Sequence, residues 1–232
     1  MFLNDLLPLL QERIMRLFKY TQKRFADDLL KGKIYLPNMR SYHNLEHHGK
    51  AVGDSEEATN VQNLTGQFDL AENQIPGIRG GPGSTGTVHI KDSTFITGFT
   101  DLYAFCVSTV CTESLMKKFS DMNQEVGKPP YDACLEIINT GRFRRRLRQT
   151  ALEQCKLILF TDGKCKYSKT IGNVPVKNPQ LEPRHFLEKP PEFEYQEEYR
   201  FGFVLHKTVN TVAPYYQIDN PALGAHFSEV KI

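Results

Sequence analysis

The sequence predicts a single α+β domain, and three observations lead to that fold class. The chain has 232 residues, of which 40% are hydrophobic and 24% charged, the balance of an ordinary globular protein. Extended segments outnumber helical ones, and the two kinds follow one another in mixed order, which favours α+β. No internal repeat or convincing linker divides the chain. We therefore expect one domain over residues 15–232, preceded by a short amphipathic helix in residues 1–14.

The individual elements follow from hydrophobic periodicity and from turn signals. Residues 15–20 predict a strand, and residues 21–31 predict a helix that Thr21 caps and Gly32 ends. The other predicted strands cover residues 33–36, 87–90, 94–99, 103–110, 132–138, 156–161 and 193–206. The other predicted helices cover residues 54–64, 113–119 and 142–149. Three connections are predicted: a glycine-rich hairpin tip or mobile loop in 75–86, a hairpin turn at 162–163 with a return through 165–167, and a proline-rich connector in 173–191.

Charge and cysteine content narrow the environment and the partners. The net charge is only +2, so any affinity for nucleic acid must come from a local basic patch. The five cysteines are scattered and form no CxxC pair, which indicates neither a disulfide framework nor a four-cysteine zinc site. A reducing compartment fits best, so we expect a cytoplasmic protein. The apolar first ten residues carry Asp5 and are too short to span a bilayer, so no membrane role is expected.

The segment FEYQEEYRFGFVL is the strongest candidate for a functional site. Side chains alternate in a strand, so one face of this segment is mostly apolar and the other is polar up to its glycine. The first face holds Tyr195, Glu197, Tyr199, Phe201 and Phe203, and the second holds Glu194, Gln196, Glu198, Arg200 and Gly202. A carboxylate and a neutral amide two residues apart can grip a polar ligand and stabilise developing positive charge. The alternative is a solvated sheet face on which Arg200 pairs with Glu198.

Three segments together resemble the ADP-ribosyltransferase superfamily. They are LFKYTQKRFADDLLKGKIYL (Leu17–Leu36), YAFCVSTV (Tyr103–Val110) and YQEEYRF (Tyr195–Phe201). The first resembles the opening strand and helix of that superfamily, the second its central strand with a Ser-Thr pair, and the third its Gln/Glu-x-Glu strand. The layout also resembles a broad, poorly characterised family of bacterial proteins with a Gly-Asp-x-x-Glu segment, here Gly53, Asp54 and Glu57.

This resemblance implies a mixed, mainly antiparallel split β-sheet with flanking helices, and NAD as the substrate. It implies that Glu198 is the catalytic glutamate and that Gln196 orients the acceptor. Tyr20 would stack on nicotinamide and Ser108 or Thr109 would brace Glu198 or the ribose, with Lys19 beside them on the NAD side. The acceptor would be a macromolecule, either protein or nucleic acid such as RNA. The chain would then act as a toxin or phage-defence effector, restrained by an antitoxin or another regulatory protein.

The segment GRFRRRLR supports a different interpretation, a binding module without catalysis. On a helix, Phe143 and Leu147 share one face and arginines surround most of the remainder. Guanidinium groups grip phosphate in bidentate fashion, so this helix could contact RNA, DNA or an acidic partner. The alternative to this binding interpretation is a solvent-exposed helix whose arginines form ion pairs with acidic residues elsewhere in the chain. The arginines concerned are Arg142, Arg144, Arg145, Arg146 and Arg148.

The segment HNLEHH carries the second alternative function, a metal-dependent nuclease. His43 and His47 are spaced i and i+4, which on a helix could hold a metal ion. Asp54, Glu56 and Glu57 follow as further ligands in that interpretation, and a polar surface loop is the competing one. Cys106 lies in the middle of an apolar run, which indicates a buried structural thiol.

Overall fold

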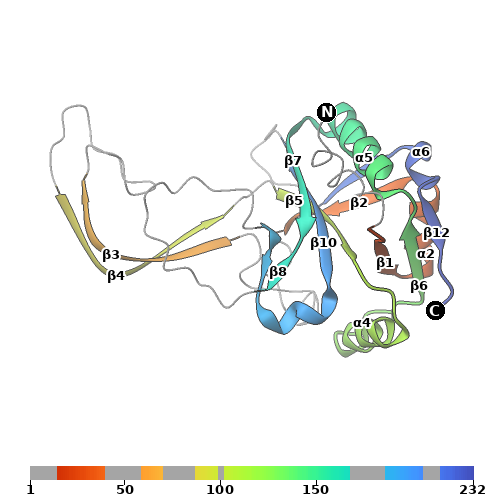
Figure 1. The fold of residues 1–232 in the computed structure, drawn as a ribbon, viewed down its shortest axis with the longest axis horizontal. Helices are drawn as coiled ribbons and strands as arrows, with labels where there is room; N and C mark the ends of the chain where they lie inside the picture. The colour runs from red at the N-terminus through yellow and green to blue at the C-terminus, as the bar shows by residue number, and fades with distance from the viewer. Residues whose placement is uncertain (1–14, 40–58, 70–86, 99–101, 168–185, 206–214) are drawn as a thin grey trace, which may run out of the picture.

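The computed structural model describes residues 15–39, 59–69, 87–98, 102–167, 186–205 and 215–232 (Figure 1). Its centre is a six-stranded antiparallel sheet of order β12-β6-β1-β5-β10-β7. The predicted α+β class with a mainly antiparallel sheet is confirmed. The strands of this sheet are β1 (Phe18–Thr21), β5 (Leu102–Ser108), β6 (Ala133–Ile137), β7 (Leu157–Lys164), β10 (Glu198–Leu205) and β12 (Phe227–Glu229).

Among the described residues, helices and three smaller sheets surround this centre. The helices are α2 (Lys23–Leu30), α4 (Glu113–Glu125), α5 (Thr140–Cys155), α6 (Pro221–Gly224) and the 3-10 helix η4 (Pro191–Gln196). The small sheets pair β2 (Lys33–Pro37) with β11 (Tyr215–Asp219), β3 (Thr59–Asp69) with β4 (Thr87–Gly98), and β8 (Lys166–Tyr167) with β9 (Glu188–Lys189). In Figure 1 the β3–β4 ribbon extends to one side of the six-stranded sheet.

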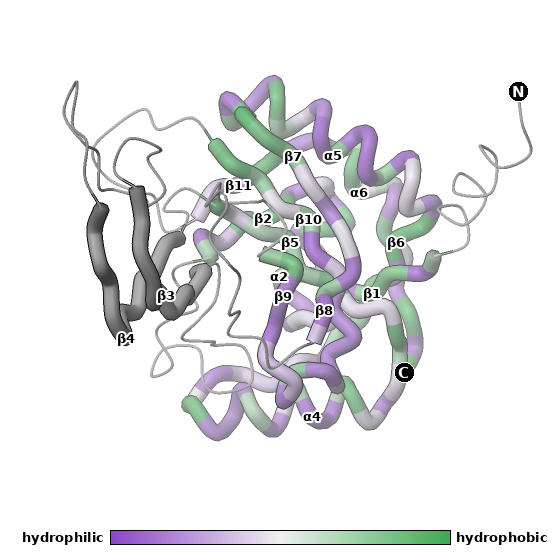
Figure 2. The backbone as a smooth tube through the Cα atoms, turned by 60° about the vertical axis from the view of Figure 1, so that its left-hand side comes forward, coloured by the Kyte–Doolittle hydropathy of each residue, from purple (hydrophilic) through white to green (hydrophobic). Residues whose placement is uncertain are grey.

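The main hydrophobic core covers one face of the sheet. It combines apolar side chains of β5, β6 and β10 with those of α2, α5, β2 and β11. Figure 2 shows α5 with hydrophilic and hydrophobic stretches in alternation, as expected of a helix that buries one side. Phe143 and Leu147 form that buried side, as predicted. The opposite face of the sheet carries smaller apolar clusters, under α4 and around Phe186.

The sheet is split between β1 and β5. Those two strands share a single register pair, Phe18 with Ser108, whereas β1 pairs with β6 along its whole length. On the other side, β5 and β10 stay paired from Ser108 and Glu198 to Leu102 and Val204. The sheet therefore consists of two halves, β12-β6-β1 and β5-β10-β7, which meet at one point and diverge from it.

Two predictions for the region before β5 differ from the structure. Residues 59–64, predicted as part of a helix, begin the eleven-residue strand β3, and the predicted strands 87–90 and 94–99 form the continuous strand β4. The two strands pair antiparallel from Thr59 with Gly98 to Asp69 with Thr87. Cross-strand pairing thus overrides the helix predicted for residues 59–64. The glycine-rich residues 75–86 and the predicted helix in 1–14 lie outside the described residues.

Two predicted boundaries near β7 and α2 are also wrong. Asp162 and Gly163 do not form a hairpin turn; they continue β7, pairing with Phe201 and Arg200 of β10, and β8 pairs in parallel with β9. Thr21 belongs to β1 and does not cap α2, whose first residue instead donates its N–H to Asp132. Gly32 does end the helix, with φ of +85° and the Asn220 carbonyl so close that a Cβ could not fit.

The predicted strand 193–206 begins later than expected. Residues 191–196 form η4, Glu197 adopts a left-handed conformation with φ of 45°, and β10 begins at Glu198. The prolines before the segment favour this turn because they cannot donate to a sheet ladder. Strict alternation therefore holds only from Glu198 onward, where Tyr199, Phe201 and Phe203 enter the main core as predicted.

Candidate functional site

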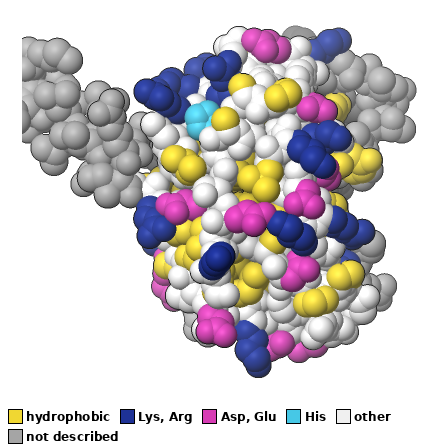
Figure 3. Space-filling model, turned by 90° about the vertical axis from the view of Figure 1, so that its right-hand side faces the viewer, with side chains coloured by type: hydrophobic (Ala, Val, Ile, Leu, Met, Phe, Trp, Pro, Cys, Tyr) yellow, Lys and Arg dark blue, Asp and Glu magenta, His cyan; other side chains and the backbone are white. Residues whose placement is uncertain are grey.

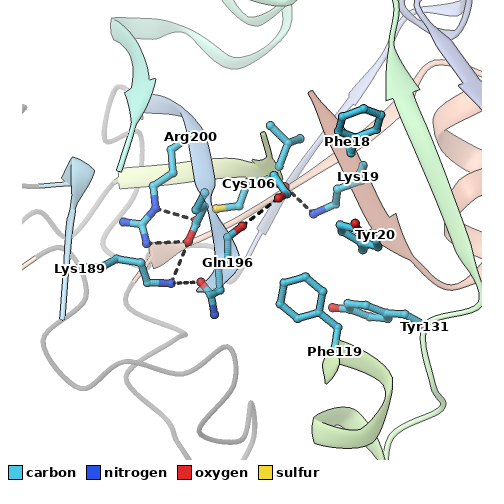
Figure 4. A pocket seen from close by; sticks show the side chains of 12 residues that line it. Phe18, Lys19, Tyr20, Cys106, Phe119, Tyr131, Lys189, Gln196 and Arg200 are labelled. Atoms are coloured by element: carbon cyan, nitrogen blue, oxygen red, sulfur yellow. Dashed lines mark hydrogen bonds and ion pairs between the residues drawn. The ribbon is translucent and has the colours of Figure 1, made fainter. Parts of the chain in front are cut away.

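A cavity of about 120 Å³ lies in the split of the sheet. Figure 4 shows a polar group of side chains from β10, η4 and β9 on one side, and aromatic side chains from β1 and α4 on the other. An apolar cavity of about 150 Å³ can hold a benzene molecule, so this space suits one small ring or polar group. Its lining comprises Phe18, Lys19, Tyr20, Cys106, Val107, Ser108, Phe119, Tyr131, Lys189, Gln196, Glu198 and Arg200.

Glu198 is a buried carboxylate held between two buried cations. The residue lies in the protein interior, with only 7% of its surface exposed to solvent. Arg200 Nε donates to Oε1 at 2.8 Å, and Lys189 Nζ donates to Oε2 at 2.8 Å. Burial alone would raise the pKa of Glu198, but the charges of Arg200 and Lys189 outweigh it and lower that pKa below its ordinary value. Glu198 is therefore ionised at neutral pH and fixed in orientation.

Lys189 links the two predicted catalytic residues. Its ammonium group also donates to Oε1 of Gln196 at 2.7 Å, so one cation holds both the amide and the carboxylate. The residue is 4% exposed and its ammonium lies 4.7 Å from the centre of the Phe193 ring. The predicted continuous strand would have placed Gln196 and Glu198 on the same face. In the structure Gln196 belongs to η4 and Glu198 to β10, and the contacts with Lys189 hold the two side chains together.

Ser108 and Thr109 brace the chain segment that carries this pair. The Ser108 hydroxyl donates to the main-chain oxygen of Gln196 at 2.9 Å. The Thr109 hydroxyl donates to the main-chain oxygen of Glu197 at 3.1 Å, and its N–H donates to the same oxygen at 2.8 Å. Both therefore hold the backbone next to Glu198, and Ser108 lines the cavity whereas Thr109 does not.

Lys19 crosses the split of the sheet. It lies on β1, and its ammonium donates to the main-chain oxygen of Cys106 on β5 at 2.8 Å. Burial lowers the pKa of Lys19, with the charge of Glu198 acting in the opposite direction. The ammonium lies at the edge of the cavity and can donate a further hydrogen bond to a ligand carbonyl or phosphate.

Tyr20 and Phe119 form the aromatic side of the cavity with Tyr131. The Tyr20 and Phe119 ring centres are 5.4 Å apart, and those of Phe119 and Tyr131 are 6.0 Å apart. Tyr20 does not use its hydroxyl in the cavity, because that group accepts from the Thr112 N–H at 2.8 Å and donates to the Val110 carbonyl. Burial raises the pKa of Tyr20 to about 12. Its ring is therefore held in place as a packing surface.

Cys106 lies between the two sides of the cavity (Figure 4). Burial raises the pKa of its thiol well above the ordinary value, and the charge of Glu198 adds to that effect. A thiol in that state is a poor nucleophile, in keeping with the predicted structural role.

The structure thus brings together five of the six residues predicted for catalysis and NAD binding: Lys19, Tyr20, Ser108, Gln196 and Glu198. The polar face of β10 is not the solvated face of the alternative interpretation, although Arg200 does pair with Glu198. Sequence reasoning missed Lys189, Phe119 and Tyr131. Lys189 falls in a proline-rich stretch without periodicity, and nothing in the local sequence distinguishes it from a surface lysine.

The arginine-rich segment forms part of α5, as predicted, and the helix is longer, from Thr140 to Cys155. Arg144 has a structural role, because its Nε donates a hydrogen bond to the buried Asp162 carboxylate of β7 at 2.7 Å. The exposed arginines of the segment are Arg142, Arg145, Arg146 and Arg148. On the face shown in Figure 3, basic side chains are interspersed with acidic ones, as the small net charge leads one to expect.

The predicted metal cluster of His43 and Glu57 lies outside the described residues. Within the part of the chain that the structure describes, no group of three His, Cys, Asp or Glu side chains could hold a metal ion. The described helices include none long and apolar enough to cross a membrane.

Comparison of the chain with protein-family models, with curated proteins and with solved structures gave no match in any of the three.

Proposed function

We propose that the chain is an NAD-dependent ADP-ribosyltransferase that modifies a macromolecule, either protein or nucleic acid. One observation carries the proposal: an ionised, buried glutamate and a glutamine two residues before it line a ring-sized cavity opposite Lys19 and Tyr20. That cavity opens where the two halves of the sheet diverge. The sequence resemblance to ADP-ribosyltransferases supports the same residues in the same roles.

The cavity chemistry suits cleavage of the bond between nicotinamide and ribose. When that bond breaks, its electron pair leaves with nicotinamide and positive charge develops on the ribose, where the acceptor then attacks. The Glu198 carboxylate binds the ribose 2′-hydroxyl and stabilises this charge, which it can do because it stays ionised. Lys189 and Arg200 hold the carboxylate in one orientation before the ligand arrives.

The remaining side chains of the cavity contact different parts of NAD and of the acceptor. The rings of Tyr20, Phe119 and Tyr131 offer an aromatic surface for the nicotinamide ring, and Lys19 offers a donor to its carboxamide oxygen or to a phosphate. Gln196 orients the acceptor, with its amide held by Lys189. Action as a toxin or phage-defence effector, under the control of an antitoxin or regulatory protein, completes the proposal and rests on the resemblance.

The test is incubation of the purified chain with NAD labelled in its adenylate phosphate, alone and with cell lysate. Wild type should release nicotinamide or label a lysate component, and digestion with protease or ribonuclease then identifies the acceptor class. Glu198→Gln should lower the rate by about a hundred- to a thousandfold, the size expected for losing one electrostatic contact to a transition state.

The matched control is Glu194→Gln, which removes an exposed carboxylate from the same segment and should leave the rate within about twofold. Circular dichroism of each variant confirms that it is folded. The proposal fails if wild type neither hydrolyses NAD nor labels any component, or if Glu198→Gln retains full activity.

A second candidate, a nucleic-acid-binding module, is favoured by the exposed arginines of α5. Phosphate contacts release counterions, so binding of a duplex RNA should weaken steeply with salt. The double variant Arg145→Gln with Arg146→Gln should reduce the slope of log binding constant against log salt concentration by about the value of two phosphate contacts. Lys117→Gln on α4 should leave that slope unchanged. RNA binding that survives Glu198→Gln and is lost in the double arginine variant would favour this module over the enzyme.

A further inference from the structure

Two cysteines, Cys111 and Cys134, have neighbouring side chains in the apolar cluster under α4. Cys111 follows β5 in the connection to α4, and Cys134 lies on β6, 23 residues later. Their Sγ atoms are 3.9 Å apart. Both belong to the apolar cluster that also holds Tyr20 and Phe119 of the cavity.

We propose that Cys111 and Cys134 are a redox-sensitive modification site: they form a reversible disulfide on exposure to a peroxide, and this bond alters the Tyr20 side of the cavity. The inference concerns the thiols and the loop between them, and it does not rest on the ligand that the cavity takes.

With hydrogen peroxide as the oxidant, the chemistry consumes one molecule of peroxide and leaves two molecules of water. Cys111, the more exposed thiol, attacks the peroxide: a sulfur–oxygen bond forms, the oxygen–oxygen bond breaks, and the first water leaves. The Cys134 thiol then displaces the hydroxyl group, which departs with the Cys134 proton as the second water. Burial and the neighbouring Cys111 raise the pKa of Cys134, so this step depends on the 3.9 Å proximity of the two sulfur atoms and not on a free thiolate. The two thiols lose two electrons and the peroxide gains them. A disulfide bond measures about 2.05 Å, so the sulfur atoms must approach by about 1.9 Å.

The contacts around Cys111 connect this movement to the cavity. The Tyr20 hydroxyl bonds the residues on either side of Cys111, accepting from the Thr112 N–H at 2.8 Å and donating to the Val110 carbonyl at 3.1 Å. Tyr20 is also the direct register partner of Cys134 across β1 and β6. Drawing Cys111 toward Cys134 therefore displaces the loop that anchors the Tyr20 hydroxyl.

The same loop positions a second residue of the cavity. Thr112 caps α4, its hydroxyl accepting from the Leu115 N–H at 3.2 Å, and that helix carries Phe119 into the cavity wall. The bond would thus act on both aromatic residues, Tyr20 and Phe119, while Glu198 and Lys189 on the opposite side keep their contacts.

The first test treats the full chain with hydrogen peroxide and maps its peptides by mass spectrometry. A peptide joining Cys111 to Cys134 should appear, lighter by two hydrogens, and a dithiol reductant should remove it. Cys111→Ser and Cys134→Ser should each abolish the joined peptide. Cys155→Ser, at the end of α5, is the control and should leave it unchanged. Because Cys134 is buried, its variant could fail to fold, and Cys111→Ser then carries the test.

The second test measures hydrogen exchange in residues 110–116 of reduced and oxidised protein. The Thr112 amide should exchange at least tenfold faster after oxidation, since it loses the Tyr20 oxygen as its acceptor. Oxidation of Cys111 to sulfinic acid without any joined peptide would overturn the proposed bond. A joined peptide with unchanged exchange at Thr112 would overturn its effect on the cavity.

Discussion

The two faces of β10 are both buried, yet they are built from opposite kinds of side chain. Tyr199, Phe201 and Phe203 enter the main core, whereas Glu198 and Arg200 are 7% and 1% exposed on the other face. The apolar face stabilises the fold through the surface it removes from water. The charged face gains little from burial, because desolvation of two ions offsets their attraction. Buried charge that adds little stability marks the face where function is to be sought.

Breaking the apolar face should have the largest effect on stability. Phe201→Ala removes a fully buried ring from the middle of the core and should lower the free energy of unfolding by about 3–5 kcal/mol. Denaturation by urea, followed by circular dichroism, measures this loss. Leu152→Ala on the exposed side of α5 is the control and should change stability by less than about 1 kcal/mol. An equal loss in both variants would contradict the distinction between the core face and an exposed position.

Removing one partner from the charged face should have the next largest effect. Arg200→Met leaves the buried Glu198 carboxylate with Lys189 as its remaining cationic partner and should lower the free energy of unfolding by about 3 kcal/mol. The double variant Glu198→Gln with Arg200→Met should recover part of that loss, because no unpaired carboxylate remains. Strictly additive losses in the urea midpoints would show that the two side chains do not depend on one another.

The sequence predicts the apolar face of β10 well and the site only in part. Alternation from Tyr199 to Phe203 follows directly from the strand period, and the buried side of α5 follows from helical spacing. The sequence does not reveal that Gln196 belongs to a 3-10 helix, because Glu197 in a left-handed conformation breaks the alternation. Lys189 could not be foreseen, since its contacts with Gln196 and Glu198 depend on how η4 turns the chain back, and no local periodicity indicates that turn.

The turn predicted at Asp162-Gly163 fails for a related reason. That dipeptide is typical of hairpins, yet here Asp162 stays in β7 because its carboxylate accepts from both Arg144 and Tyr199. A Cβ at Gly163 would come within 2.7 Å of the Leu187 Cδ1 atom, so a larger residue there would require the Leu187 side chain to move. In both places a tertiary contact decides the conformation, and a contact of this kind has no local sequence signature.

Changing pH should separate the two faces without a core mutation. The folded-state pKa of Glu198 is lowered, so its contribution to stability is complete above the unfolded-state value of about 4.5 and is lost as the pH falls below it. The stability difference between wild type and Glu198→Gln, measured in urea, should therefore be largest near pH 6–7 and shrink toward pH 3. Phe201→Ala should show the same deficit at each pH. A constant difference for Glu198→Gln would mean that the folded-state pKa is not lowered.

The smallest expected effect tests how Ser108 supports the charged face. Its hydroxyl donates to the Gln196 carbonyl and accepts from the Val110 N–H, and Ser108 is the register partner of Glu198. Ser108→Ala should lower stability by about 1–2 kcal/mol, since it leaves these two groups without that partner. In the NAD assay it should reduce the rate by no more than about tenfold, because the Glu198 carboxylate keeps its own cations. Ser114→Ala, on the exposed side of α4, should change neither quantity. If Ser108→Ala abolished activity as completely as Glu198→Gln while the protein stayed folded, Ser108 would have to contact the ligand itself.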